Sequence, residues 1–284
     1  MLWETFQMER MQSTWENRVD YNLSESGVHP LSLREFLSEN QIRELESLEL
    51  GYPQSNGTEE LRRNIARRYP NAGPDNILVT SGGSEANFLS VCRLVERGDQ
   101  ISMILPNYMQ MWGLGRSLQA QVNPLWMRRD SSGWRLDLDL LRKLPATTRA
   151  LIVCNPNNPT GATLNEEEMN AIVEAAERAQ AYLICDEIYC GAEHDADSHS
   201  RTPSFWGRYP KVIITNGLSK AYGLPGLRIG WIATTVELAE QLWSYHDYTT
   251  ISMSMLSERI AAIVLSANVE PKILERTRKI IRDN

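Results

Sequence analysis

The sequence predicts an α/β fold in which a mostly parallel sheet is flanked by helices on both faces. Apolar segments of strand length recur along the chain, and helical patterns separate most of them. These segments do not alternate with polar residues, which is typical of parallel strands buried on both faces. The strand candidates are Ile77–Thr80, Ile101–Leu105, Leu151–Cys154, Tyr182–Cys185, Val212–Thr215 and Ile229–Ala233. The helices predicted between them are Glu85–Glu96, Met109–Leu118 and Asn165–Ala179.

The chain is predicted to have three regions. Residues 1–45 form an N-terminal arm, with turn residues around Gly27 and Pro30 and a short amphipathic helix after them. Residues 46–250 form the large domain, in which Thr58 opens a capped helix with acidic residues in its first turn. Residues 251–284 hold two further helices, Ser252–Leu265 and Glu270–Arg282.

The last predicted helix carries an apolar stripe without an obvious partner in the chain. The stripe consists of Ile273, Leu274, Thr277, Ile280 and Ile281. An amphipathic helix buries its apolar face against another element. We therefore expect the chain to stop before a small C-terminal domain that would cover the stripe.

Composition and charge argue against several classes of function. The chain has 284 residues, of which 42% are apolar and 23% charged, and its net charge of −7 without a basic stripe disfavours nucleic-acid binding. The start of the chain carries acids and lacks the apolar segment of a secretory signal, and no apolar run is long enough to span a bilayer. The cysteines show no CxxC spacing, so reduced thiols in or near the core and a cytoplasmic location are predicted for Cys92, Cys154, Cys185 and Cys190.

One lysine has an unusual setting. Lys220 lies in the run GLSKAYGLPGLRIGW between apolar segments, whereas the other four lysines occupy a polar connector, a strand start or the charged tail. Gly223, Pro225 and Gly226 punctuate the backbone and would hold the lysine side chain in one place. Two interpretations are open: an exposed turn lysine, or an amine positioned to react.

Other polar residues follow the predicted strands at their carboxyl ends, where parallel α/β sheets bind ligands. The run SGGSEAN, with Gly83 and Ser84, places backbone N–H groups at a helix start, which suits an anion. The run lacks the GK[ST] of a triphosphate-binding loop, and a simple tight turn is the alternative interpretation.

Two more strand ends carry polar side chains. In NPNNPTG, two Asn-Pro pairs set a rigid turn that holds Asn158 at the sheet edge, and Asn155 is interpreted as turn chemistry alone. Asp186, in DEIY, follows a buried strand, where a carboxylate is costly unless a cation meets it. A ligand is a candidate for that cation.

These features together indicate a site for one small molecule. It would present a phosphate to the helix start and to Arg228, a cationic nitrogen to Asp186 and a carbonyl to Lys220. Pyridoxal 5'-phosphate carries all three groups, and its sites typically combine a lysine Schiff base with an acidic partner for the pyridinium nitrogen.

From about Gly51 to Trp231 the sequence resembles the class I/II aminotransferases, pyridoxal-phosphate-dependent enzymes of fold type I in the aspartate aminotransferase superfamily. Five separate motifs occur in the family's order. The resemblance implies that Lys220 forms the Schiff base and that Asp186 pairs with the pyridine nitrogen. It also implies that Tyr189 and Asn158 hydrogen-bond the phenolic oxygen of the cofactor ring.

The resemblance assigns further residues to the cofactor. Tyr108, in LPNYMQM, matches the aromatic residue that stacks on the cofactor ring. Gly83 and Ser84 match the phosphate-binding turn, and Arg228 matches the phosphate arginine. Gly217 stands where many relatives carry a phosphate-binding serine, and Ser219 is the hydroxyl next to the lysine.

The resemblance also concerns the substrate and the subunits. Tyr52, in GYPQSNGTEELR, matches a tyrosine that reaches the phosphate of the neighbouring subunit, which implies a homodimer with shared sites. Gly27 falls where the N-terminal segment passes over the substrate, and Asn158 is assigned to the substrate as well. The family's small C-terminal domain, with its arginine for the α-carboxylate, is expected to be missing.

The implied activity is the transfer of an amino group from an L-amino acid to a 2-oxo acid. Lys220 would act as the general base, a role that a cationic neighbourhood and partial burial would favour. Two alternatives stay open. One is a lyase or cyclising enzyme with the same Schiff base, and the other is a fragment or regulatory module that binds pyridoxal phosphate without turnover.

Overall fold

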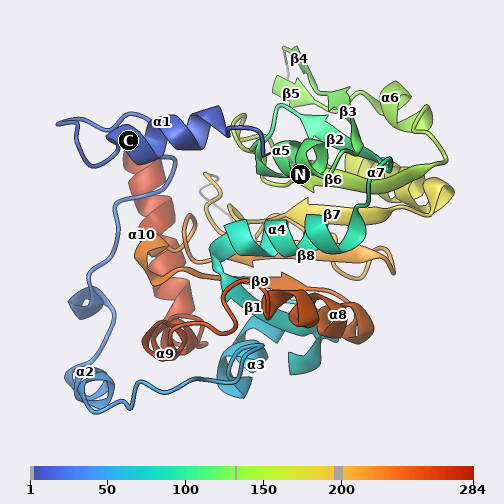
Figure 1. Ribbon diagram of the computed structural model, residues 1–284. Coiled ribbons are helices and arrows are strands. Elements are labelled where there is room, and N and C mark those ends of the chain that lie inside the picture. The colour runs from blue at the N-terminus through green and yellow to red at the C-terminus, as the bar shows by residue number, and fades with distance from the viewer. Residues whose placement is uncertain (1–2, 132, 195–200) are drawn as a thin grey trace.

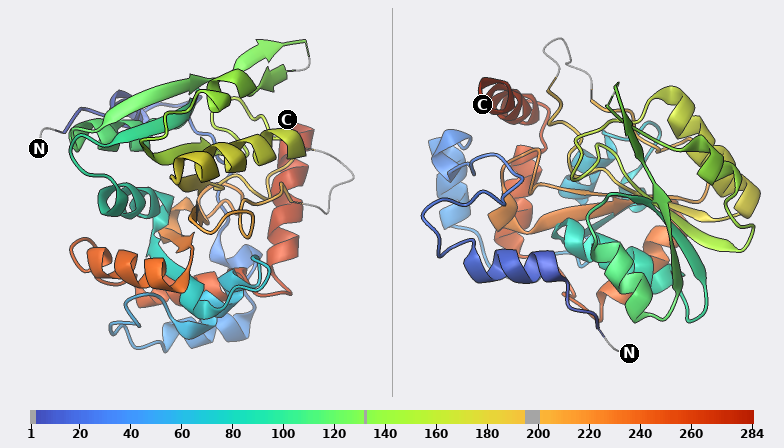
Figure 2. Two further views of the ribbon diagram at one scale, coloured as in Figure 1. Left: turned by 90° about the vertical axis from the view of Figure 1, so that its right-hand side faces the viewer. Right: turned by 90° about the horizontal axis from the view of Figure 1, so that it is seen from above.

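The computed structural model describes residues 3–131, 133–194 and 201–284, which form three layers with the sheet in the middle (Figures 1 and 2). The main sheet has seven strands in the order β1-β9-β8-β7-β6-β2-β3. Its strands are β1 Ile77–Ser81, β2 Gln100–Leu105, β3 Gln121–Trp126, β6 Thr148–Cys154, β7 Tyr182–Asp186, β8 Val212–Gly217 and β9 Ile229–Ala233. A separate antiparallel pair consists of β4 Arg128–Asp130 and β5 Gly133–Arg135.

The predicted α/β fold with a mostly parallel sheet is confirmed. All six predicted strands are present, and the pairs β2–β3, β2–β6, β6–β7 and β7–β8 are parallel. Only β9 runs against its neighbours in the main sheet, β1 and β8. The sequence patterns did not predict β3 of the main sheet or the separate pair β4 and β5, and in β3 Pro124 reads as a strand breaker. As an edge strand, β3 pairs on one side alone and can accommodate a proline.

Helices cover both faces of the sheet. The α-helices are α1 Gln7–Trp15, α2 Glu39–Glu46, α3 Glu59–Ala66, α4 Gly82–Leu94, α5 Gln110–Ser117, α6 Leu138–Arg142, α7 Glu166–Ala179, α8 Val236–His246, α9 Met255–Val264 and α10 Glu270–Asp283. The short 3-10 helices are η1 Leu33–Glu35, η2 Pro74–Asn76 and η3 Pro225–Leu227. Helices α4, α5 and α8 pack on one face, and α3, α6, α7 and α9 pack on the other.

Two helix boundaries bear on the site. Helix α4 starts at Gly82, earlier than the predicted Glu85, so the glycine turn forms the first turn of the helix itself. Helix α7 starts where predicted, because the Asn165 side chain accepts a hydrogen bond from the backbone N–H of Glu168 at 2.9 Å.

The N-terminal arm contains helix α1, which was not predicted from the sequence. None of the residues of α1 is buried.

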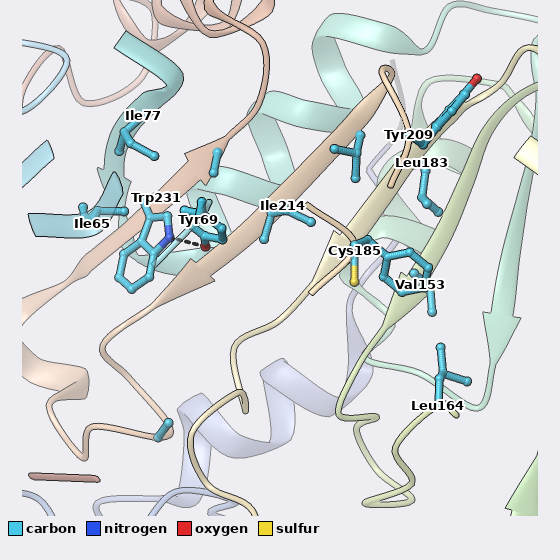
Figure 3. Close-up of a cluster of buried hydrophobic side chains, with 14 of the residues drawn as sticks. Ile65, Tyr69, Ile77, Val153, Leu164, Leu183, Cys185, Tyr209, Ile214 and Trp231 are labelled. Carbon is cyan, nitrogen blue, oxygen red and sulfur yellow. Dashed lines mark hydrogen bonds between the residues drawn. The ribbon is translucent and has the colours of Figure 1, made fainter. Parts of the chain in front are cut away.

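The hydrophobic core lies in two clusters, one on each face of the sheet. Figure 3 shows part of the larger cluster, where Trp231 of β9 is fully buried beside Ile65 of α3. The indole N–H of Trp231 donates to the Tyr69 hydroxyl at 2.9 Å, drawn as a dashed line in Figure 3. A buried indole needs such an acceptor, so this bond fixes β9 against the chain that follows α3.

The cysteines agree with their prediction: all four are free, and Cys154, Cys185 and Cys190 are buried. Within the part of the chain that the structure describes, no helix has both the length and the apolar character needed to cross a bilayer.

The expectation that the stripe on the last helix lacks a partner is wrong for its first half. Ile273 and Leu274 of α10 are buried, because the helix packs against the loop that follows β7. A Cβ atom at Gly191 would lie 3.0 Å from a Leu274 methyl group, so a glycine there lets α10 approach closely. Arg278 donates to the Gly191 carbonyl at 3.1 Å and pairs with Glu193 at 2.9 Å. Later in the stripe, Ile280 and Ile281 are half-buried.

We predict that Leu274→Ala lowers the free energy of unfolding by about 2–5 kcal/mol, the usual cost of a cavity left by a buried leucine. Leu256→Ala is the matched control on the preceding helix, because Leu256 is exposed. Urea denaturation followed by circular dichroism measures both variants. Equal losses in the two variants would show that α10 is not packed as described.

Candidate active site

A cavity of about 640 Å³ opens at the carboxyl ends of β6 and β7. A second cavity, of about 780 Å³, adjoins it and shares Glu25, Ser26, Asn158, Pro159, Tyr189 and Lys220 with it. In Figure 1 the arrowhead of β7 points to the side of the sheet where α1 and α10 lie. The structure therefore brings strand ends, the N-terminal segment and the last helix to one place.

Most of the residues singled out from the sequence line the first cavity. They are Gly83, Ser84, Tyr108, Asn158, Asp186, Tyr189, Ser219, Lys220 and Arg228. Gly27 lines the second cavity, next to Lys220. Tyr52 lines neither, and its side chain is 88% exposed on another part of the surface.

Asp186 ends β7 at the floor of the first cavity and is buried. Its carboxylate accepts hydrogen bonds from the backbone N–H of Ile188 at 3.0 Å and from the Asn87 amide at 3.2 Å. Burial raises the pKa of Asp186, and these two hydrogen bonds oppose that shift. Among the described residues, no lysine, arginine or histidine forms an ion pair with it.

Asn87, which no sequence pattern indicated, orients the aspartate. The Thr215 hydroxyl of β8 donates to the Asn87 side-chain oxygen at 2.7 Å, so the amide nitrogen is turned toward Asp186. Both Asn87 and Thr215 are buried. The signal in the sequence was weak, because an asparagine inside the predicted helix and a threonine in a strand are ordinary residues.

The glycine turn and Arg228 meet at the start of α4. Gly82 has a φ of +73°, and a Cβ atom there would lie 2.5 Å from the Arg228 guanidinium. On the other side, a Cβ atom at Gly230 would lie 2.3 Å from the Gly82 carbonyl carbon. Only glycines allow the arginine and β9 to pack directly against the turn. The first backbone N–H groups of α4 and the guanidinium therefore sit side by side, which suits an anion.

The structure explains the absence of a serine at position 217. A Cβ atom on Gly217 would lie 2.9 Å from the Ile229 carbonyl oxygen and 3.1 Å from the Gly230 Cα. Backbone atoms leave no room for a side chain there. Ser219, which lines the cavity, is the hydroxyl available near the lysine.

Lys220 is paired with a residue that sequence analysis did not single out. Its Nζ atom lies 2.7 Å from the Oε1 atom of Glu25, in the segment after α1. Partial burial raises the pKa of Glu25, but the hydrogen bond and charge of Lys220 outweigh this, so the pKa is lowered overall. The expected cationic neighbourhood of Lys220 is thus wrong in this respect: a carboxylate lies against the amine.

Two tyrosines close the site by contacts with the N-terminal segment. The Tyr189 and Ser26 hydroxyls are hydrogen-bonded at 2.7 Å, and burial raises the pKa of Tyr189 to about 12 although this bond opposes the shift. The Tyr108 hydroxyl donates to Glu9 of α1 at 2.6 Å, and burial together with that carboxylate raises the pKa of Tyr108 strongly. No local sequence pattern indicates these contacts, because they join residues far apart in the chain.

The asparagines of the NPNNPTG turn have separate positions. Asn155 accepts a hydrogen bond from the backbone N–H of Leu164 at 3.0 Å, as its interpretation as a turn residue predicts. Asn158 lines both cavities.

A partly buried cluster of charged side chains contacts the lysine loop, which is the segment between β8 and β9 that carries Lys220. Arg68, which follows α3, contacts both the Tyr222 hydroxyl and the Glu270 carboxylate. The Tyr222 hydroxyl donates to Glu270 at 2.6 Å, and Arg201 pairs with the same carboxylate at 2.8 Å. Because Tyr222 stands two positions after Lys220, the cluster ties the start of α10 to the lysine loop.

Comparisons with known proteins agree with this geometry. The model of the family "Aminotransferase class I and II" matches residues 23–284. Capreomycidine synthase of Streptomyces vinaceus is 33% identical over 263 residues, 89% of this chain and 66% of that protein. A PLP-dependent aminotransferase from Streptococcus suis 89-1591 has a TM-score of 0.90 at 30% identity, covering 100% of this chain and 76% of its own. The PLP-dependent cyclase OrfR has a TM-score of 0.81 at 29% identity, covering 95% and 70%.

Fold and sequence thus define the class of protein: a fold type I α/β domain of the aspartate aminotransferase superfamily. The chain belongs to the aminotransferase class I and II family. Enzymes of this family use pyridoxal 5'-phosphate, act on amino acids and 2-oxo acids, and typically form dimers. The chain spans about half to two thirds of the length of the curated relatives it matches.

Glu187, next to Asp186, generates a pH-dependence prediction. It is buried, accepts hydrogen bonds from the Ser204 hydroxyl at 2.7 Å and the Phe205 N–H at 3.1 Å, and burial raises its pKa to about 7. Between the unfolded value of 4.5 and about 7 the native state binds more protons than the unfolded state. The contribution of Glu187 to the free energy of unfolding is therefore fully present at low pH and is lost as the pH rises through about 7.

We predict that Glu187→Gln, which keeps both acceptor contacts, removes this loss. Thermal unfolding midpoints of the variant and the wild type should converge near pH 5 and separate above pH 7, with the variant more stable. Glu237→Gln, an exposed residue on α8, is the control. Parallel pH profiles for wild type and Glu187→Gln would contradict the prediction.

Proposed function

We propose that the chain is a pyridoxal-phosphate-dependent aminotransferase, which transfers the amino group of an L-amino acid to a 2-oxo acid and holds the cofactor on Lys220. One observation carries the proposal: the buried Asp186, which lacks a cationic partner among the described residues, faces the same cavity as Lys220, Arg228 and the start of α4. A negative group at one part of the cavity and an anion-binding turn at another match a molecule with a cationic ring nitrogen and a phosphate.

The residues present fit pyridoxal 5'-phosphate. The glycines at 82 and 230 let the Arg228 guanidinium and β9 pack directly against the first turn of α4, which brings the guanidinium beside the backbone N–H groups of that turn. The Asp186 carboxylate, left with only neutral hydrogen-bond donors, would be stabilised by the protonated ring nitrogen. A cavity of about 640 Å³ has the size of a small-molecule site.

Each lining residue then has a role in holding the cofactor. Gly83, Ser84, Ser219 and Arg228 would bind the phosphate, and Lys220 would bind the aldehyde carbon. In the cavity wall, Tyr108 would stack on the ring, and Tyr189 with Asn158 would hydrogen-bond its phenolic oxygen. The first group comes from the α4 turn and the lysine loop, and the second from the loops after β2, β6 and β7.

The cofactor supplies an electron sink next to the α-carbon of a bound amino acid. Asp186 would hold a proton on the ring nitrogen and so strengthen that sink by electrostatic stabilisation. Lys220 Nζ would take up and return the proton of the substrate α-carbon as a general base. Gly27 and Asn158 border the space that the substrate would enter.

Subunit contacts and location complete the proposal. Tyr52, exposed and distant from the chain's own cavity, would reach the phosphate of a second copy in a homodimer. The free, mostly buried cysteines agree with a reducing cytoplasmic location.

A second candidate is a cyclising or lyase reaction on the same cofactor. It is favoured by the likeness to capreomycidine synthase and to the cyclase OrfR. A third, which the sequence left open, is a module that binds the cofactor without turnover. Conversion of the cofactor to its pyridoxamine form by an amino acid selects the first candidate. Release of ammonia or of a cyclised product selects the second, and a cofactor spectrum unchanged by amino acids selects the third.

We predict that borohydride reduction of the protein incubated with pyridoxal 5'-phosphate leaves a pyridoxyl group on the peptide that contains Lys220. Mass spectrometry of the digested protein measures this. Lys220→Ala should remove the label, whereas Lys211→Ala, at a half-buried lysine that does not line the cavity, should keep it. A label spread evenly over several lysines would argue against the assignment.

We predict that Asp186→Ala still binds the cofactor on Lys220 but loses turnover by about 100-fold or more, because the ring nitrogen loses its stabilising charge. A stopped assay of amino transfer under single-turnover conditions measures the rate, and the absorbance of the bound cofactor reports occupancy. Near-normal transfer in this variant would falsify the role given to Asp186.

A further inference from the structure

Glu25 stands at the junction of the two cavities and lines both. Its Oε1 atom accepts hydrogen bonds from the Gly27 backbone N–H at 2.6 Å and from Lys220 Nζ at 2.7 Å. Neighbouring residues hold this segment on both sides: Ser24 accepts from the Gln12 side chain of α1 at 2.9 Å, and Ser26 bonds to Tyr189. The carboxylate is therefore held beside the lysine by the backbone.

The cation bound by Glu25 is the same amine that the proposed function uses to hold the cofactor. A lysine nitrogen bonded to the cofactor aldehyde is no longer free to remain a full ammonium partner for Glu25. Among the described residues, no other lysine, arginine or histidine pairs with Glu25. The Gly27 N–H is a neutral donor, so a carboxylate facing both cavities would be left without an ammonium partner.

We propose that Glu25 is an ammonium-binding residue of the active site, which Lys220 occupies in the free chain and the amino group of an incoming amino donor occupies once Lys220 holds the cofactor. This proposal rests on the proposed function for its second half. The nitrogen of the amino donor must reach the cofactor carbon to which Lys220 Nζ would be bonded. The Oε1 atom of Glu25 lies 2.7 Å from Nζ and therefore close to that position. A carboxylate at this position attracts and orients a primary ammonium group there.

The site distinguishes the two substrates of amino transfer. An amino acid brings an ammonium group that can pair with Glu25, whereas a 2-oxo acid has none. Loss of the carboxylate should therefore weaken binding of the amino donor and leave binding of the 2-oxo acid almost unchanged. A residue that only supported the fold would affect both ligands alike.

The first experiment needs no cofactor. Lys220→Ala empties the ammonium site, and n-propylammonium carries the same atoms that the substitution removes beyond Cβ. Nuclear magnetic resonance titration should show n-propylammonium binding to Lys220→Ala up to about five-fold more tightly than to wild type or to the double variant Lys220→Ala/Glu25→Gln. A five-fold change is the upper range for a partly exposed ion pair. Neutral 1-propanol should not discriminate among them.

The matched control is Lys220→Ala/Glu16→Gln, because Glu16 is another acid that lines the first cavity. It should bind n-propylammonium as tightly as Lys220→Ala. Equal affinity of Lys220→Ala and Lys220→Ala/Glu25→Gln would overturn the proposal. Circular dichroism of each variant confirms that it is folded, and Glu25→Asp, with its shorter side chain, should bind with intermediate affinity in the same background.

The second experiment uses the cofactor-loaded protein and equilibrium binding rather than activity. Glu25→Gln should raise the Kd of 2-methylalanine, which has no α-hydrogen to lose, about five-fold, and change the Kd of pyruvate less than about two-fold. Equal changes for both ligands would contradict the proposal. If the protein took up no cofactor, the proposed function would fail, while the n-propylammonium titration would still decide the ammonium site.

Discussion

The buried carboxylate of Asp186 is the constraint around which the site is arranged. It ends a central parallel strand, and within the described chain it receives neutral hydrogen bonds but no counter-charge. A carboxylate in that position is tolerated because two donors hold it and because Thr215 turns the Asn87 amide toward it. The same cavity has a positive region at the start of α4 beside Arg228. The cavity is thus dipolar, and a ligand with an anionic and a cationic end fits both regions.

The lysine loop obtains its position from both ends of the chain. On one side of the loop, its residue Tyr222 contacts Arg68, which follows α3, and Glu270, the first residue of α10. These three side chains form one partly buried cluster. In addition, the Leu31 backbone N–H donates to the Gly223 carbonyl at 3.1 Å, and Glu25 pairs with Lys220 itself. The loop between β8 and β9 is therefore held by segments near residues 25–31 and 270, which explains how a lysine in a glycine-rich turn keeps one orientation.

The N-terminal segment contributes polar side chains to the walls of both cavities. Helix α1 has no buried residue of its own. However, its residue Glu9 and the preceding Phe6 both contact Tyr108 at the first cavity. Glu25 and Ser26 reach the lysine and Tyr189. Polar contacts of this kind cost little to form at a half-exposed surface and can exchange partners, which suits a segment that lies where the two cavities adjoin.

Local patterns in the sequence determined six of the seven strands of the main sheet, most of the helices and the residues at the strand ends, because buried parallel strands and glycine or proline turns leave a local signal. Tertiary structure alone decided the partners of those residues. Asn87, Thr215 and Glu25 carry no local signal of function, since each acts on a residue from a distant segment. The burial of the α10 stripe and the proline-containing edge strand β3 were likewise decided by packing and pairing with elements that a local pattern cannot identify.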